Sequence, residues 1–397
     1  MSKLKILFIQ GASLQSLNAL TALYGMGHMA VCYPENEETI EKDEEHEEKF
    51  ADFLREKPMD FVRTHSYTSA IARQTKKYGV KYAIYTLDSP SYATWLADAF
   101  QYDHCYFFYF DKKEYQLVKS LGGRNVYYLP LAAEIRRAGN LVITDEEIQK
   151  HACDISFVGG LYTKNPYDVC AQDFSESFRN QVSNMMEECA FLWDGCSRMD
   201  SYITQEMIEA IKNRLPAIFE ELNAGGEYNM PEAYYIKQWF FSRKLTNIER
   251  TLLIELLAER YHLHFHTWDW EIVPPGVTRL PETDVEGAYK VFYASKINLN
   301  ITLRSIESGV PQRIFDIMSV GGFVLSNWQE EMPELFEEDK EIVLFKTPEE
   351  MLEKIDYYLS HEEERIRIGI NGYQKVKNCY SCEHQLNKLI SVLFPEG

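Results

Sequence analysis

A short segment with basic and amide side chains around an apolar run is the first place where ligand chemistry is expected. Lys296 precedes the run 297–301, which predicts a buried strand, and Asn300 and Arg304 lie at or beyond the end of that strand. Ligands of open parallel sheets bind at the carboxyl ends of the strands. Lys296, Asn300 and Arg304 are therefore candidate binding residues.

The helix predicted from Pro311 to Val320 follows soon after and suits a diphosphate. Pro311 at its first turn leaves exposed N–H groups and the positive end of the helix dipole beside the preceding loop. Lys296 or Arg313 would neutralise the diphosphate, and the Asp316 carboxylate would accept hydrogen bonds from both hydroxyls of a ribose. An alternative stays open: Arg313 and Asp316 can form an i, i+3 ion pair on a solvated face, worth about a few tenths of a kcal/mol.

The first turn of the chain is a weaker candidate. Gly11, Ala12 and Ser13 follow an apolar strand and precede a helix, but they lack the G-x-G-x-x-G pattern of dinucleotide sites. This turn is either a plain tight connection or a loop whose N–H groups face an acceptor or donor phosphate.

Alternating strands and helices position these residues and predict an α/β fold. Strands are expected at 4–9, 29–33, 61–62, 82–86, 105–110 and 126–129, with helices between them, which indicates a parallel sheet in a Rossmann-like domain over 1–150. A second domain, 151–380, begins with the strand 154–158, continues through a helical insertion at about 167–261, and rebuilds a second Rossmann-like unit. The segment 381–397 is expected to form a helix that crosses the junction between the domains.

Composition narrows the possible partners. The formal net charge of −20 makes nucleic acid and anionic membranes poor partners. No apolar stretch is long enough to span a membrane and the amino terminus lacks a secretory pattern, so a cytoplasmic protein with reduced cysteines is expected. No histidine pattern and no Asp-x-Asp pattern suggests a metal site.

Several segments together resemble a known family. The segments are 293–300, 310–326, 335–336, 341–343 and 349–373, and they are similar to the C-terminal half of the CgeB-like, spore-maturation-type glycosyltransferases, relatives of the GT-B group-1 glycosyltransferases. The segments 86–90, 125–132 and 154–159 resemble the uncharacterised N-terminal domain usually fused to that half.

The resemblance implies a GT-B fold, in which two Rossmann-like domains face a central cleft, and transfer of a sugar from a nucleotide-sugar donor to an unidentified acceptor. It implies a nucleotide-sugar co-substrate, no cofactor, and chemistry without a metal. The donor would bind the C-terminal domain and the acceptor the N-terminal one. A catalytically silent sugar- or nucleotide-binding scaffold and a GT-B-like nucleotide-sugar epimerase are the alternatives.

The resemblance also assigns roles to single residues. Asp316 stands where group-1 enzymes carry a ribose-binding Glu, and Ser308 stands where they carry an earlier Glu, with Glu307 beside it as a candidate catalytic residue. Asp88 would be the base on the acceptor side, or else a turn residue before Pro90.

His266 would contact the donor, with the aromatic side chains of 268–270 available to stack on a base or sugar. Arg243, Lys244 and Arg250 are expected to be helical surface charge, although one of them could face the diphosphate.

Overall fold

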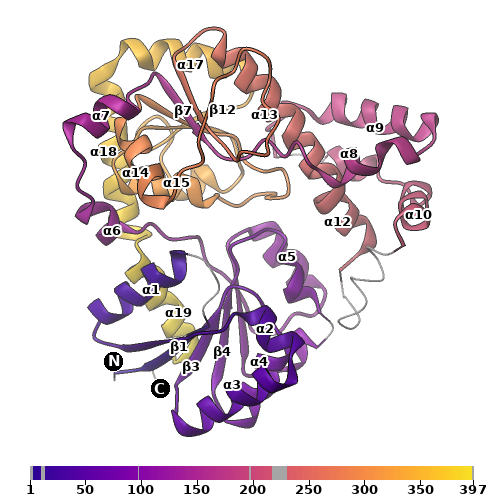
Figure 1. Cartoon of the computed structure of the whole chain (residues 1–397), viewed down its shortest axis with the longest axis vertical. Coiled ribbons are helices and arrows are strands. Elements are labelled where there is room, and N and C mark those ends of the chain that lie inside the picture. Colours follow the sequence, from indigo (N-terminus) through magenta and orange to yellow (C-terminus); the bar gives the residue numbers. More distant parts are fainter. Residues whose placement is uncertain (1–2, 10–13, 97, 196–197, 217–229, 396–397) are drawn as a thin grey trace. The chain divides into compact units, whose positions relative to one another are not determined.

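The computed structural model describes residues 3–9, 14–96, 98–195, 198–216 and 230–395. These residues form two compact units (Figure 1). In the described chain, the first unit contains the residues up to Ala132 and from Tyr380 onward, and the second contains the residues from Ala133 to Cys379.

The first unit is built on a parallel sheet of six strands in the order β2-β1-β3-β4-β5-β6. Nearly every residue of the four inner strands is buried, as a sheet covered on both faces requires, whereas the edge strands are only partly buried. The strands are β1 (Lys5–Ile9), β2 (Met29–Tyr33), β3 (Phe61–Thr64), β4 (Lys81–Tyr85), β5 (Cys105–Tyr109) and β6 (Val126–Tyr128).

Helices cover this sheet, and their starts are set by capping side chains. Asn36 and Asp43 accept hydrogen bonds from backbone N–H groups at the starts of α2 and α3, and Asp111 does so for α5. The helix α1 packs beside α19, and α2, α3 and α4 pack on one another. The bounds are α1 (Leu14–Gly25), α2 (Glu37–Lys42), α3 (Glu44–Glu56), α4 (Ser69–Lys77), α5 (Lys112–Ser120) and α19 (Cys382–Leu393).

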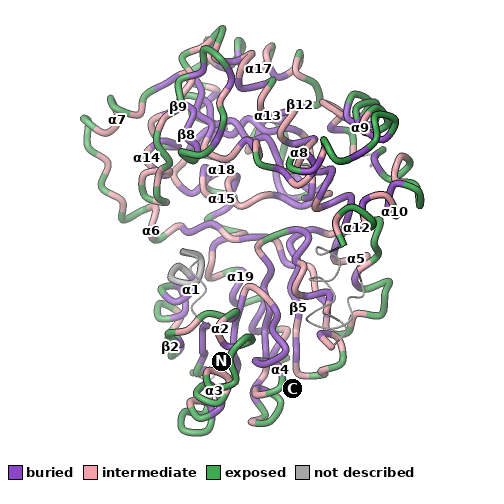
Figure 2. Tube along the Cα trace, turned by 45° about the vertical axis from the view of Figure 1, so that its right-hand side comes forward, coloured by how far each residue is buried: buried purple, intermediate pink, exposed green. Residues whose placement is uncertain are grey.

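The second unit repeats the plan with a parallel sheet of six strands in the order β12-β11-β10-β7-β8-β9. Figure 2 shows much of this sheet as buried chain, and its strands supply eight of the twenty buried residues that the structure describes in the unit's apolar core. The strands are β7 (Ile155–Val158), β8 (Leu263–His266), β9 (Arg279–Leu280), β10 (Ile297–Asn300), β11 (Val324–Asn327) and β12 (Val343–Phe345).

Between β7 and β8 the described chain is helical, which agrees with the expected insertion. This stretch contains α8 (Pro166–Cys170), α9 (Glu176–Cys189), α10 (Gln205–Arg214), α12 (Glu232–Ile236), a π-helical turn (Lys237–Phe241) and α13 (Ser242–Ala258). The other helices of the unit are α6 (Ile135–Asn140), α7 (Asp145–His151), α14 (Val285–Ala294), α15 (Gln312–Ser319), α16 (Met332–Leu335), α17 (Pro348–Ser360) and α18 (Glu362–Cys379).

The prediction of two Rossmann-like parallel sheets is confirmed. The segment 133–150, expected with the first half, packs within the second unit, where α7 lies against α14 and Glu147 pairs with Lys290. The chain leaves the second unit after α18, and α19 completes the first unit. In the part of the chain that the structure describes, no helix is both long and apolar enough to cross a bilayer.

Candidate functional site

Two arginine side chains meet at the carboxyl edge of the second sheet. There β7 ends in the turn Gly159-Gly160, and its neighbour β10 ends at Asn300. Gly159 has φ +154, and a Cβ added to it would lie 2.4 Å from Nη2 of Arg313. The turn therefore needs glycine for its backbone conformation and for the close approach of a guanidinium group.

Arg313 reaches this turn from the first turn of α15. Its Nη1 donates to Oδ1 of Asn300 at 2.8 Å, and its guanidinium lies 5.1 Å from the ring centroid of Phe157. Asn300 is fully buried and is held by hydrogen bonds from its Nδ2 to the hydroxyls of Thr302 and Ser326, at 3.0 and 2.9 Å. Its amide oxygen is thereby turned toward Arg313, which fixes the guanidinium across the strand ends.

A second guanidinium, from Arg250 of α13, lies at the same turn. Its Nη1 donates to the carbonyl of Gly160 at 2.6 Å and its Nε to the carbonyl of Ile301 at 3.1 Å. It lies 5.4 Å from the centroid of the same Phe157 ring that Arg313 contacts. The expectation that Arg250 is helical surface charge is wrong, because its side chain is only 3% exposed.

No carboxylate forms an ion pair with either arginine among the described residues, although the nearby charges of Glu249 and Glu271 act on Arg250 and that of Asp316 acts on Arg313. The hydrogen bonds of the two guanidinium groups go to neutral oxygens. Burial, and next the positive charge of Arg250, lower the pKa of Arg313 to about 9. A pKa of about 9 keeps Arg313 charged at neutral pH, so this edge of the sheet can attract an anion.

Asp316 lies on the same helix, three residues after Arg313. Burial raises the pKa of its carboxyl to about 6, opposed by hydrogen bonds with Gln312 and Tyr289 and by the charge of Arg313. Its Oδ1 accepts from Nε2 of Gln312 at 2.9 Å. The alternative of a solvated Arg313–Asp316 ion pair does not describe the structure, in which Arg313 donates to Asn300. Pro311 stands as the N-cap of α15, one residue before its first turn.

Lys296 is not brought to this cluster. It lies before β10, at the amino edge of the sheet, and its Nζ is 2.8 Å from Oδ1 of Asp154, the residue before β7. The sheet therefore separates Lys296 from the ends of the same strands, where Asn300 and Arg313 meet.

Arg304 and Glu307 lie in the loop after β10 and hold the helical insertion. Arg304 Nε donates to Oε2 of the fully buried Glu249 at 2.8 Å, and Nη1 donates to the carbonyl of Leu192 at 2.9 Å. Glu307 pairs with the buried Lys237 at 2.7 Å, and Asp200 pairs with the same amine at 2.8 Å. Both predicted site residues thus anchor the insertion to the loop beside the arginine pair.

His266 is the last residue of β8, and its ring lies 6.3 Å from the ring of His151 at the end of α7. Its Nδ1 lies 2.9 Å from the carbonyl of Pro281, and its buried Nε2 has no hydrogen-bond partner. Burial lowers its pKa, so the ring is neutral at pH 7. Trp268, two residues on, is 44% exposed, and its ring lies beside Gly160, 3.6 Å from where a Cβ would stand.

The predicted residues of the first half lie in the first unit. Asp88 is exposed in the turn that follows β4, directly before Ser89 and Pro90. Gly11, Ala12 and Ser13 lie outside the residues that the structure describes.

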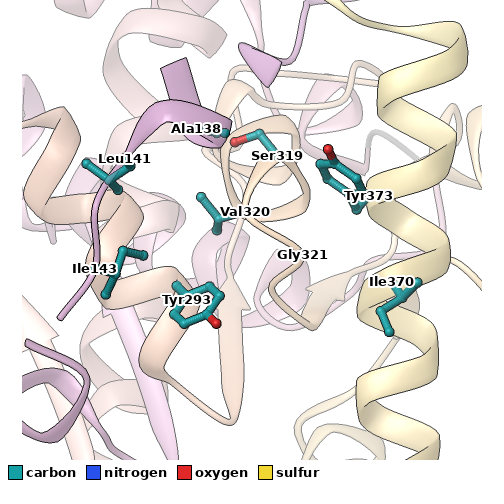
Figure 3. Close-up of a pocket in the computed structure, with 10 residues that line it drawn as sticks. Ala138, Leu141, Ile143, Tyr293, Ser319, Val320, Gly321, Ile370 and Tyr373 are labelled. Atoms are coloured by element: carbon teal, nitrogen blue, oxygen red, sulfur yellow. The ribbon is translucent and has the colours of Figure 1, made fainter. Parts of the chain in front are cut away.

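A pocket of about 370 Å³ also lies in the second unit but belongs to the opposite edge of the sheet (Figure 3). Tyr293 and Gly321, which precede β10 and β11, line it together with Ile370 and Tyr373 from α18. None of the predicted site residues lines this pocket. Over the described residues, no group of three or more potential ligand side chains is arranged to hold a metal ion.

Sequence reasoning missed the role of Arg250, although a signal was present. The buried positions of α13 include Leu245, Thr246, Glu249, Leu253 and Leu257. Arg250 lies three residues before Leu253 and seven before Leu257, so helical periodicity places it on the inward stripe with the apolar residues. A basic residue on such a stripe is either paired or functional.

Part of the second unit matches a known family. Residues 243–391, which contain Arg250, Asn300, Arg313 and Asp316, match the family model described as Glycosyl transferase-like. A comparison with curated protein sequences gave no match.

Solved structures share the fold at low sequence identity. HepE from Anabaena, solved in complex with UDP and glucose, has a TM-score of 0.52 at 11% identity, covering 98% of this chain and 99% of that one. Sucrose-phosphate synthase from Thermosynechococcus elongatus has a TM-score of 0.53 at 9% sequence identity, and the match covers 100% of both chains. A glycosyltransferase from Rickettsia africae ESF-5 has a TM-score of 0.50 at 11% sequence identity, and this match also covers 100% of both chains. The chain therefore has the GT-B arrangement of two Rossmann-like units.

Proposed function

We propose that the protein is a glycosyltransferase that takes a sugar from a nucleotide-sugar donor held by its second unit. The observation that carries the proposal is the pair of guanidinium groups, Arg250 and Arg313, at the Gly159-Gly160 turn, with no carboxylate paired to either. The family match over residues 243–391 supports it, as does the likeness to HepE, which was solved with UDP-glucose.

In this proposal the donor diphosphate lies against the turn after β7 and the start of α15. Arg313 and Arg250 donate to its oxygens, while the N–H groups after Pro311 add the positive end of the helix. The ribose hydroxyls donate to Asp316, whose carboxylate lies on the same helix. Trp268, exposed beside Gly160, is available to stack on the base.

The arginine pair also explains how the bond to the sugar can break. Departure of the nucleoside diphosphate leaves negative charge on its terminal phosphate, and positive groups already fixed there stabilise that charge without reorganising. We propose on this ground that transfer needs no bound cation. Activity retained in excess EDTA would support this, and activity restored only by Mg²⁺ or Mn²⁺ would exclude it.

We propose Asp88 as the base on the acceptor side, because it is an exposed carboxylate directly after a strand of the first unit. Glu307 is proposed to act through the loop after β10, which its pairing with Lys237 holds in place. The finer proposal, that the chain is of the CgeB-like, spore-maturation type, rests on the sequence segments that resemble that family.

Calorimetry with UDP-, ADP-, GDP- and TDP-sugars tests the donor site. For the nucleotide that binds, Arg313→Met should raise Kd about tenfold to a hundredfold, since a charge-assisted hydrogen bond contributes about 1.5–3 kcal/mol. Arg367→Met is the matched control, because Arg367 lies in the same unit and its side chain is exposed. If no nucleotide-sugar binds, or if both variants bind equally, the proposed donor site is wrong.

Slow hydrolysis of the bound donor in the absence of acceptor separates an enzyme from a binding scaffold. The wild type should release free sugar over hours, and NMR would detect its anomeric proton. Asp88→Asn should slow transfer once an acceptor is known and leave donor Kd unchanged. Tight donor binding with no hydrolysis and no transfer to any acceptor would favour the scaffold alternative.

A further inference from the structure

The centre of the first sheet contains an arginine that the proposed function does not use. Arg63 is on β3, in register with Phe8 of β1 and Ala83 of β4, and only 4% of its surface is exposed. Phe61, two residues before it on the same face, packs against Phe394 just after α19. The side chain of Arg63 therefore lies on the face that α19 covers, near the carboxyl end of its strand.

Nothing in the described structure neutralises this guanidinium. Its Nε and Nη1 are buried and have no hydrogen-bond partner, and no ion pair involves it. The rings of Phe8 and Tyr85 flank it, with centroids 5.1 and 5.2 Å away. Burial lowers its pKa to about 10, and the Tyr85 and Cys382 side chains oppose this shift only in their deprotonated forms. Arg63 is therefore charged at neutral pH.

A buried charge without a partner is strongly destabilising, and buried polar groups in native proteins are nearly always satisfied. The two aromatic faces offset only part of that penalty, because a cation–π contact is weaker than the hydration that the guanidinium loses. A bound anion would remove the remaining penalty of burying the Arg63 charge.

A second unsatisfied group lies on α19 close to the same tyrosine. The side chain of Gln385 is 2% exposed, and its Nε2 donates to the carbonyl of Pro130, which also accepts from the Tyr85 hydroxyl at 2.6 Å. Its Oε1 is buried without a partner. The site therefore offers unused donors on Arg63, which lies over the Tyr85 ring, and an unused acceptor on Gln385, which shares the Pro130 carbonyl with the Tyr85 hydroxyl.

We propose that Arg63 binds a negatively charged group, a carboxylate or a phosphate, on the acceptor of the transfer reaction, and that Gln385 accepts a hydrogen bond from a hydroxyl of the same molecule. Open parallel sheets bind ligands at this edge. The anion site stands by itself, whereas its identification with the acceptor rests on the proposed function.

Titration with inorganic phosphate tests the anion site. Phosphate should raise the Tm of the wild type, and the rise should be smaller in Arg63→Met, in which only the proposed donor site can still bind phosphate. The matched control is Arg124→Met, which removes an exposed arginine of the same unit and should keep the full phosphate response. Equal responses in the three proteins, or no response in the wild type, would overturn the proposal and indicate that water alone fills the site.

The stability of Arg63→Met separates binding from a structural role. Because the variant removes an unpaired buried charge, its Tm without phosphate should equal or exceed that of the wild type. If this variant does not fold, Arg63→Lys keeps the charge but loses the planar set of donors, and its phosphate Kd should rise at least tenfold. An unchanged Kd in that variant would contradict the proposal.

Transfer assays show whether the anion that Arg63 binds is a carboxylate or a phosphate. They also separate a wrong acceptor assignment from a wrong proposed function. Glucuronate, glucose 6-phosphate and glucose are offered as acceptors with the donor that binds. A preference for one of the two charged sugars that Arg63→Met abolishes, with donor Kd unchanged, is the expected result. Charged and neutral sugars used equally would overturn the acceptor assignment. Loss of donor binding would count against the function, whereas the phosphate titration would still report on Arg63.

Discussion

Two ionisable groups of the proposed donor site set the pH range in which it can bind. Asp316 accepts hydrogen bonds from ribose only when ionised, and burial raises its pKa to about 6. Arg313 donates to phosphate only when charged, and burial with the charge of Arg250 lowers its pKa to about 9. The site has its full complement of charges between these two values.

Nucleotide-sugar affinity should therefore form a plateau between about pH 6 and about pH 9. Calorimetry with a nucleotide-sugar measures this, because its doubly esterified diphosphate does not titrate in the range. Asp316→Asn should weaken binding at pH 7.5 and abolish the fall on the acidic side. An acidic limb that survives in Asp316→Asn would show that another group controls it.

A buried glutamate makes the stability of the first unit fall as the pH rises from 4.5 to about 8. Glu114 is 1% exposed, and its Oε1 accepts from the backbone N–H of Ser91 at 2.9 Å and from Trp95 Nε1 at 3.2 Å. Its Oε2 has no partner. Burial raises its pKa from 4.5 to about 8. Between these values the folded protein keeps a proton that the unfolded chain releases, so the free energy of unfolding falls as the pH rises.

Glu114→Gln removes that titration while preserving an acceptor for Ser91. Its Tm should exceed that of the wild type at pH 8, and the advantage should vanish near pH 4.5. Thermal unfolding monitored by circular dichroism at several pH values provides the measurement. Parallel Tm curves for the two proteins would contradict it.

At the scale of elements, the turn after β7 needs a glycine at position 159 both for its backbone conformation and for the space that Arg313 occupies. Gly159→Ala would strain a backbone at φ +154 and place a methyl 2.4 Å from Nη2 of Arg313, so the flexible guanidinium would be displaced from Asn300. We expect donor Kd to rise at least tenfold. Calorimetry and Tm are measured on the same protein.

Gly276→Ala provides the control, because Gly276 also has positive φ, +81, but has nothing within 4 Å of an added Cβ. It should cost about 1–2 kcal/mol in stability and leave donor affinity unchanged. If both variants lower affinity equally, backbone strain rather than the displacement of Arg313 is responsible.

Much of this architecture could be predicted from sequence, because apolar runs and periodicity act locally. The strand ending at Asn300 and the helix with Arg313 were predicted, and the structure brings the two side chains into contact. Lys296 does not join them because it precedes the strand that ends at Asn300. That four-residue strand spans about 13 Å, which places Lys296 at the other edge of the sheet. The pairing of Arg304 with Glu249 could not be predicted, because the two residues are distant in sequence.

The proposed site of the first unit was beyond sequence reasoning for a similar cause. From sequence, a basic residue next to a short apolar strand is expected to be exposed or at an edge of the sheet. Only the packing of α19 shows that Arg63 is buried. Gln385 comes from that same helix, which is separated from β3 by the whole of the second unit in sequence.

At the scale of the whole molecule, each unit has its own sheet, and the first depends on residues that follow the second. The side of α19 that packs on the first unit includes Leu386, Leu389, Ile390 and Leu393, each at most 4% exposed. Lys81 of β4 donates to the carbonyl of Leu393.

Deleting residues 380–397 should therefore unfold the first unit and spare the second. Burial of each of those aliphatic side chains contributes about 1.5–3 kcal/mol, and their sum is comparable to the whole stability of a domain. Hydrogen exchange should become fast in β1, β3 and β4 and stay slow in β10 and β11. Retained protection in β3 would contradict the prediction.

This chain path has a consequence for biosynthesis. The strands β1 to β6 leave the ribosome long before α19 exists, so one face of the first sheet, with Phe61 and Arg63, stays uncovered in the nascent chain while the second unit is being made. Chaperones that bind exposed apolar segments would find their target there, and the unit synthesised first would be the last to reach its native packing.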